Sequence, residues 1–287
     1  MSPFPEKEWD TEITSKSSLF DLRLKDTWHY RDLLLLLVRR DFVSFYKQTI
    51  LGPIWFFVQP IITILIYNLV FANLAGIKTD GIPGPLFYLA GTIIWNYFAD
   101  CLTKTSTVFR DNAGVMGKVY FPRLIMPISI VLSNLVRFAV QFILFISLML
   151  MYSGKGSPLA PNLMILLFPL LILIIAALGL GFGMIISAVT TKYRDLAFVV
   201  SFGVPLLMYT TTVIYPLSTA IAKYPAYSWI IKFNPVTAVI ETLRYGFLGK
   251  GSFSWDLLGY STGVTLVVLL VGIIIFNKVE RTFVDTV

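Results

Sequence analysis

The sequence predicts an all-α integral membrane protein with six transmembrane helices. Of its 287 residues, 56% are hydrophobic and only 14% are charged, whereas soluble domains keep roughly a quarter of their residues charged. The apolar residues gather in runs of about twenty, the length that a helix needs to cross ~30 Å of hydrocarbon. Both observations favour helices that span a membrane over a water-exposed fold.

The chain begins with a polar segment and then an amphipathic one. Residues 1–26 carry charges of both signs and lack the apolar core of a signal peptide, so we expect a cytoplasmic tail. Residues 27–53 combine apolar positions at helical spacing with charges, which predicts a helix along the cytoplasmic membrane surface and its connection. This helix is either a plain anchor or a docking element. Its central charges are Arg39, Arg40 and Asp41.

Residues 54–287 form the predicted six-span membrane domain. Gly52-Pro53 opens the first span, because proline is well tolerated in a first helical turn. Glycine- and proline-rich turns or charged loops separate most of the apolar runs. The predicted spans are residues 54–74, 86–108, 124–152, 163–189, 196–215 and 257–276.

The stretch 216–256 contains apolar pieces, none of which is long enough to cross a bilayer. Asn234 and Pro235 predict a helix start, with an N-cap followed by proline in the first position. Glu241 and Arg244 interrupt the apolar stripe that follows. About a dozen residues cover only ~18 Å, which predicts a short re-entrant or interfacial helix.

The distribution of lysine and arginine predicts the orientation. With the N-terminus inside, sixteen of these residues lie on the inner side and six on the outer side, as the positive-inside rule requires. An even number of spans then returns the C-terminus to the cytoplasm. We interpret the net charge of +7 as this topology signal rather than as a nucleic-acid-binding surface.

Several kinds of chemistry are excluded by residue content. A single cysteine, Cys101, and a single histidine, His29, argue against a disulfide, a metal site and histidine-based catalysis. Neither Gly117-Lys118 nor Gly249-Lys250 fits the Gly-x-x-x-x-Gly-Lys-Ser/Thr loop that binds ATP. With no catalytic constellation either, we expect no enzyme activity on this chain.

Two groups of residues are candidates for a substrate pathway. Arg137 lies in the middle of the third span with Gln141 one turn later, and an intramembrane arginine is costly enough to suggest a function. The alternative is a structural partner for a carboxylate or a helix C-terminus. Aromatic rings stack on sugar rings and suit a glycan pathway, although lipid-facing or core packing is equally open. The aromatic candidates are Trp55, Tyr67, Trp95, Tyr97 and Phe98.

Short motifs occur in the order typical of one family. They are residues 46–55 (YKQTILGPIW), Gln59-Pro60, Val70-Phe71, residues 91–98 (GTIIWNYF), residues 118–123 (KVYFPR), residues 193–195 (YRD), Tyr215-Pro216 and Asn234-Pro235. From residue 28 to the C-terminus, the chain resembles the permease subunits of ABC-2 type exporters of polysaccharides.

The resemblance implies a permease homodimer with two copies of a separate ATPase subunit, which binds ATP and Mg, and no cofactor on this chain. It implies a channel for a lipid-linked polysaccharide, such as O antigen, capsule or teichoic acid precursor, in the bacterial inner membrane. The helix 27–46 and the loop 110–120 then contact the ATPase, and residues 216–251 form short re-entrant helices outside. The coupling candidates in the loop are Arg110, Asp111, Asn112 and Lys118.

Two alternatives stay open from the sequence. The same scaffold serves ABC-2 exporters of small amphipathic drugs or lipids, because only the width and lining of the pathway differ. A membrane scaffold or membrane enzyme without transport is the other alternative, and it depends on no ATPase partner.

Overall fold

The computed structural model of the chain describes residues 28–47, 49–116, 121–193 and 195–284. Within these ranges the regular structure is helical, and no strand occurs. The prediction of an all-α chain is therefore confirmed for the described residues. The predicted cytoplasmic tail, residues 1–26, and the coupling candidate Lys118 lie outside them.

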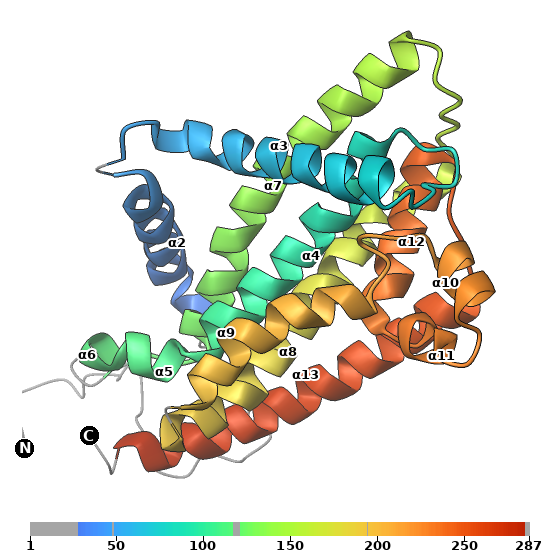
Figure 1. Cartoon of the computed structure of the whole chain (residues 1–287). Coiled ribbons are helices and arrows are strands. Elements are labelled where there is room, and N and C mark those ends of the chain that lie inside the picture. The colour runs from blue at the N-terminus through green and yellow to red at the C-terminus, as the bar shows by residue number, and fades with distance from the viewer. Residues whose placement is uncertain (1–27, 48, 117–120, 194, 285–287) are drawn as a thin grey trace, which may run out of the picture.

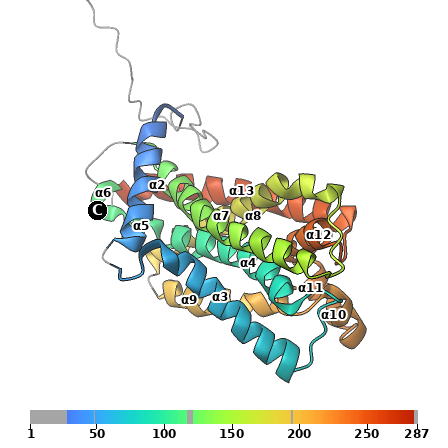
Figure 2. The ribbon, with the colours of Figure 1, turned by 90° about the horizontal axis from the view of Figure 1, so that it is seen from above.

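Long helices run side by side in the molecule, and short helices lie at their ends (Figures 1 and 2). The helices of ten or more residues are α2 (Arg31–Tyr46), α3 (Trp55–Tyr67), α4 (Gly84–Ser106), α7 (Ile125–Gly154), α8 (Phe168–Lys192), α9 (Leu196–Leu207), α12 (Pro235–Leu248) and α13 (Trp255–Val284). The short helices are α5 (Val108–Asp111), α6 (Ala113–Met116), α10 (Leu217–Lys223) and α11 (Ser228–Lys232). The 3₁₀ turns are Gly52–Ile54, Leu163–Leu167 and Met208–Thr210, and α3 continues as a π-helical segment, Asn68–Leu74.

Four helical stretches among the described residues are long and apolar enough to cross a membrane. They are Gly52–Leu74, Ile125–Gly154, Leu163–Lys192 and Trp255–Val279. They coincide with the first, third, fourth and sixth predicted spans and indicate a multi-pass membrane protein. The count of six spans stays a prediction.

The other two predicted spans correspond to α4 and α9. Helix α4 has 23 residues, about 34 Å at 1.5 Å per residue, and lies between α7 and α8 with most of its side chains buried. Helix α9 is shorter than predicted, because it ends at Leu207 and only a 3₁₀ turn follows. The carbonyl oxygens of Thr212 and Val213 accept hydrogen bonds from Arg244 rather than from a continuing helix.

Small residues bring α8 close to both of its main neighbours. A Cβ atom on Gly183 would lie 2.5 Å from Thr105 Cβ of α4, and one on Gly181 would lie 2.9 Å from Leu269 Cα of α13. Such close approach of backbones is the usual role of small residues in membrane helices. The Gly-x-x-x-Gly spacing that ends at Gly183 thus serves packing within the chain.

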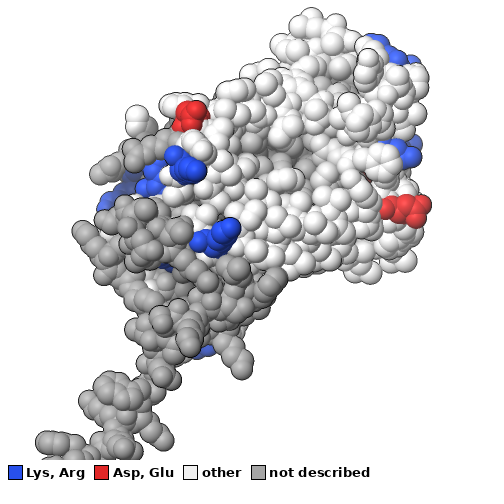
Figure 3. Space-filling view, turned by 90° about the horizontal axis from the view of Figure 1, so that it is seen from below, with Lys and Arg blue, Asp and Glu red and all other residues white. Residues whose placement is uncertain are grey.

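Charged side chains lie mainly at the two ends of the helix bundle, with an uncharged band between them on the face shown in Figure 3. One end, here the α2 end, holds α2, α5, α6 and the C-terminal part of α13 (Figure 1). The opposite end, here the α11 end, holds α10, α11 and α12. Helix α2 lies across the α2 end, transverse to α3 (Figure 1). This is the placement expected of a helix that rests on a membrane surface.

Candidate functional site

Both predicted contact elements, α2 and the α5–α6 segment, lie at the α2 end and are packed onto the long helices. Leu37 of α2 is 3% exposed and shares one apolar cluster with Phe109 and Met116. The Phe109 ring stacks on Phe276 of α13, with 4.6 Å between the ring centroids. A displacement of either element would therefore be transmitted through buried side chains to the long apolar helices.

The candidate coupling residues of α2 differ in exposure. Arg39 and Arg40 are exposed, and Arg40 Nη2 lies 2.8 Å from the carboxylate of Asp41. Asp41 is half-buried, and its other oxygen accepts a long hydrogen bond of 3.4 Å from Ser133 Oγ of α7. Asp41 thus faces the helix bundle, whereas the two arginines face outward.

The candidates in the α5–α6 segment hold that segment in shape. Arg110 and Asp111 are exposed and form an ion pair at 3.0 Å. Asp111 also accepts a 2.6 Å hydrogen bond from Thr107 Oγ1. Asn112 Nδ2 donates to the carbonyl oxygen of Val108 at 3.1 Å. Their predicted contact with an ATPase stays a prediction.

A polar cleft of about 310 Å³ lies between α2, α4 and α7, here called the α2 cleft. It is lined by Asp41, Phe42, Ser44, Lys104, Ile130, Ser133, Asn134 and Arg137. Lys104 Nζ donates to Asn134 Oδ1 at 2.8 Å. The cleft brings together a candidate coupling residue, Asp41, and a candidate pathway residue, Arg137, from elements distant in the sequence.

Arg137 has a carboxylate partner, as one of the two interpretations from the sequence proposed. Its Nη1 atom lies 3.6 Å from Asp100 Oδ2, and the two side chains are 23% and 43% exposed. The guanidinium carbon lies 5.9 Å from the centroid of the Phe56 ring of α3. Gln141 is half-buried one turn farther along α7. Because both of its side chains are partly exposed, the Arg137–Asp100 ion pair is partly solvated rather than fully buried.

Sequence reasoning did not assign Lys104 or Asn134 to a site. A signal was present, because Asn134 precedes Arg137 by three residues and so shares its helix face. Asn134 is 1% exposed, and a buried amide in an apolar helix is retained only with hydrogen-bond partners.

The aromatic pathway candidates occupy two kinds of place. Trp55 is 42% exposed on α3, and Tyr67 is half-buried. Trp95, Tyr97 and Phe98 of α4 are 3% to 5% exposed and belong to the main apolar core. In this conformation these three pack as core residues, which was the alternative interpretation. Their lining of a pathway stays a prediction.

The predicted start of α12 is confirmed. The Asn234 side chain accepts a hydrogen bond from the backbone N–H of Val236 at 3.0 Å, and Pro235 is the first helical residue. Because the N-cap fixes where α12 begins, it also sets the positions of Glu241 and Arg244 along this helix.

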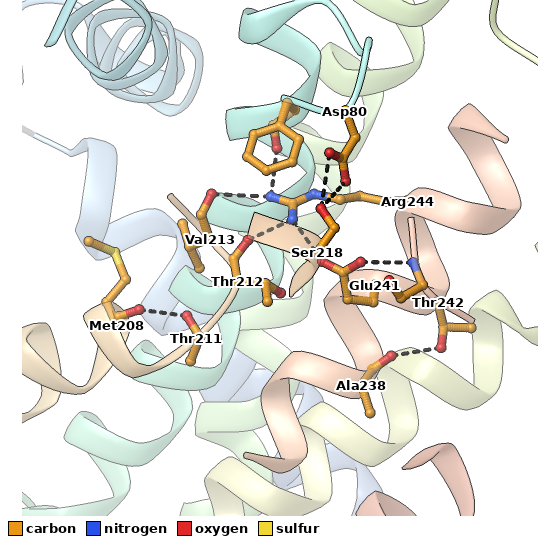
Figure 4. Close-up of polar contacts among 12 residues, drawn as sticks. Asp80, Met208, Thr211, Thr212, Val213, Ser218, Ala238, Glu241, Thr242 and Arg244 are labelled. Carbon is orange, nitrogen blue, oxygen red and sulfur yellow. Dashed lines mark hydrogen bonds and ion pairs between the residues drawn. The ribbon is translucent and has the colours of Figure 1, made fainter. Parts of the chain in front are cut away.

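Arg244 joins three segments at the α11 end (Figure 4). It is 1% exposed, and Nη1 donates to the Thr212 carbonyl at 2.6 Å while Nη2 donates to those of Val213 and Phe87 at 3.1 and 3.0 Å. Glu241 Oε1 lies 3.2 Å from Nη1 and balances the charge. This buried cluster fixes α12 on α4 and on the segment that follows α9.

No group of three or more His, Cys, Asp or Glu side chains that could hold a metal occurs in the part of the chain that the structure describes. The two polar sites instead offer charge and hydrogen-bonding groups on helices that pack against one another. Such an arrangement can bind a polar group or transmit movement between helices.

The family model of the ABC-2 type transporter matches residues 32–248. The chain belongs to the ABC-2 type transporter family. The matched range of this ABC-2 transporter begins in α2 and ends with α12. It therefore contains both contact elements, the α2 cleft and the buried Arg244 cluster.

Curated relatives match this ABC-2 transporter over most of their length. The O-antigen export system permease protein RfbA of Myxococcus xanthus is 28% identical over 92% of this chain and 98% of its own. The protein of the same name from Klebsiella pneumoniae is 28% identical over 88% and 94%. The polysialic acid transport protein KpsM of Escherichia coli is 24% identical over 80% and 87%.

Proposed function

We propose that this chain is the permease subunit of an ABC exporter that moves a lipid-linked polysaccharide across the bacterial inner membrane. The observation that carries the proposal is that three relatives named for O-antigen export or polysialic acid transport match it over 80% to 92% of its length. An apolar helix bundle with a surface helix at one end suits this role. Small amphipathic compounds remain the alternative cargo, favoured by none of these relatives' names.

The energy source is a separate ATPase subunit, which membership in the ABC-2 transporter family supports. Two permease copies pair with two ATPase copies, and ATP and Mg bind on the ATPase. Helix α2 and the α5–α6 segment supply the contact surface, with Arg39, Arg40, Arg110 and Asp111 exposed on it. Helix α2 and the α5–α6 segment lie at the same end of the molecule as the C-terminal part of α13 (Figure 1), which supports placing both termini in the cytoplasm.

Movement of the ATPase subunits reaches the membrane helices through the packed residues of the α2 end. Leu37 transmits it from α2, and Phe109 transmits it from α5 to α13. Trp55 on α3 is accessible to a glycan in this conformation. Trp95, Tyr97 and Phe98 become accessible only when α4 separates from its neighbours.

The proposal is tested in a strain whose chromosomal copy of the gene is deleted. We expect lipid-linked glycan to accumulate inside the cell and surface polymer to disappear. Wild-type protein restores export, and so does K155E, which changes an exposed charge near the α11 end. The double variant R39E/R40E fails to restore export and no longer purifies with the ATPase.

Normal surface polymer in the deletion strain, with no second exporter present, would overturn the proposal. A normal polymer combined with altered resistance to amphipathic compounds would favour the alternative cargo. Absence of any associated ATPase would remove the energy source from both.

A further inference from the structure

The α2 cleft combines features that a phosphate group requires. Its lining includes two cationic side chains, Lys104 and Arg137, one carboxylate, Asp41, and the hydroxyl groups of Ser44 and Ser133. Lysine carries three N–H donors, and the arginine fork presents five in a plane that matches phosphate oxygens. The formal charge of the lining is therefore +1, with donors in excess of acceptors.

The cleft is built rather than a gap between mobile surface side chains. Asn134 is 1% exposed and orients Lys104 through a 2.8 Å hydrogen bond. Arg137 is held by Asp100 at 3.6 Å and by the ring of Phe56 at 5.9 Å. A cation fixed in this way loses little side-chain entropy when an anion binds.

The position of the cleft suits a lipid headgroup. It lies under α2, the amphipathic helix at one end of the bundle that we expect on the membrane surface, so Arg137 faces this helix although it belongs to the middle of the third predicted span. Helix α3 adjoins it through Phe56 and exposes apolar side chains such as Trp55 and Ile62. A lipid can therefore place its phosphate in the cleft and its chains along α3.

The size of the cleft selects a headgroup over a glycan. Its volume is about 310 Å³, at the lower limit of the ~300–1,000 Å³ typical of small-molecule sites. A phosphate or diphosphate fits, but a polysaccharide does not.

We propose that the α2 cleft binds the phosphate headgroup of a membrane lipid, with Lys104 and Arg137 as the anion-binding residues. One part of the proposal rests on the proposed function, namely the expectation that the lipid carrying the glycan is one such ligand. Asp41 opposes an anion from the α2 side, so a shift of α2 away from α7 would strengthen binding. The cleft would thus couple headgroup affinity to the position of the contact helix.

The test is lipid binding to the full-length permease, purified in a neutral detergent and titrated by calorimetry. The probes are a short alkyl diphosphate, dioctanoyl phosphatidylglycerol and inorganic phosphate. Loss of one charge-assisted hydrogen bond predicts that K104Q and R137Q each weaken binding of the lipid probes by roughly ten- to a hundredfold. D41N should tighten binding, and R31Q, an exposed cation on α2, should leave it unchanged.

The opposite pattern would overturn the proposal. Unchanged binding in K104Q and R137Q would do so. Weaker binding in D41N, as in K104Q and R137Q, would also do so, because it would indicate that these residues only hold the helices together. Inorganic phosphate binding as tightly as either lipid probe would exclude a lipid ligand. If R137Q does not fold, K104Q is compared with K104R and R137K, which keep the charge. Weaker binding in K104Q alone then supports the proposal, and equal binding in all three variants contradicts it.

The two lipid probes distinguish the sources of the phosphate. Tighter binding of the diphosphate supports the headgroup of a lipid-linked substrate, and tighter binding of phosphatidylglycerol supports a resident membrane lipid. Because these titrations need no export, normal glycan export in the deletion strain would remove the proposed function and leave the binding result intact.

Discussion

The guanidinium carbon of Arg244 lies 3.6 Å from the centroid of the Phe87 ring, and the same arginine donates a 3.0 Å hydrogen bond to the Phe87 carbonyl. A cation over an aromatic face is attracted by the ring quadrupole, more strongly where water is excluded. One side chain of α12 thus holds both the backbone and the ring of a residue in α4. This contact fixes α12 relative to the centre of the helix bundle.

The first prediction concerns removal of this contact. R244M should lower the free energy of unfolding by about 3 to 5 kcal/mol, because the buried Glu241 loses its partner and three buried carbonyls lose donors. The measurement is thermal unfolding of the purified protein in detergent. K250M, which removes an exposed charge just beyond the end of α12, serves as the control and should unfold like the wild type. Equal stability of R244M and wild type would contradict this account of the cluster.

The second prediction separates the two members of the ion pair. Glu241 Oε2 accepts a 2.9 Å hydrogen bond from the Ser252 backbone, and the amide oxygen of a glutamine can accept the same bond. E241Q should therefore destabilise the protein less than R244M does. A double-mutant cycle of these variants measures the coupling, which we expect to be about 1 to 3 kcal/mol. Additive effects would show that the two side chains act independently.

Much of the fold follows from local features of the sequence. Apolar run length predicted the helices that became α3, α7, α8 and α13, because burial in lipid demands about twenty apolar residues. Asn234 and Pro235 predicted the start of α12, since an N-cap acts on its own helix. The end of α9 at Leu207 was missed, because Arg244 on a different helix supplies the hydrogen-bond donors for backbone carbonyls beyond that end.

The candidate site was less predictable, because its contacts depend on how helices pack. The sequence offered a carboxylate as one possible partner of Arg137, but only the packing of α4 on α7 identifies Asp100. The pairing of Lys104 with Asn134 has the same origin. Trp95 was a pathway candidate because it is aromatic, and composition cannot distinguish a ring in the core from a ring in a channel.

The third prediction tests the close packing of α8 on α4. A side chain at Gly183 would meet Thr105 Cβ at 2.5 Å and the Leu102 carbonyl at 3.0 Å. G183V should therefore destabilise the protein by about 1 to 3 kcal/mol through overpacking. The control is G259V on α13, where a Cβ meets nothing within 4 Å. Thermal unfolding in detergent compares the two, and equal midpoints would contradict close α4–α8 packing.

The fourth prediction concerns the route from the ATPase to the membrane helices. F109A removes the ring that stacks on Phe276 at 4.6 Å and so loosens α5 from α13. The matched control is F247A at the α11 end, where the ring lies 5.5 Å from that of Phe168. Each loss of a buried aromatic ring should cost about 3 to 5 kcal/mol of stability.

Only F109A should also disturb the ATPase, because only Phe109 lies in the proposed contact segment. We expect F109A to reduce co-purification of the ATPase subunit and to abolish export, whereas F247A retains the ATPase at a level that follows its amount in the membrane. The measurement is the ratio of ATPase to permease after affinity purification from membranes. An equal ratio in both variants would mean that α5 does not couple the two subunits, and α2 would then carry the contact alone.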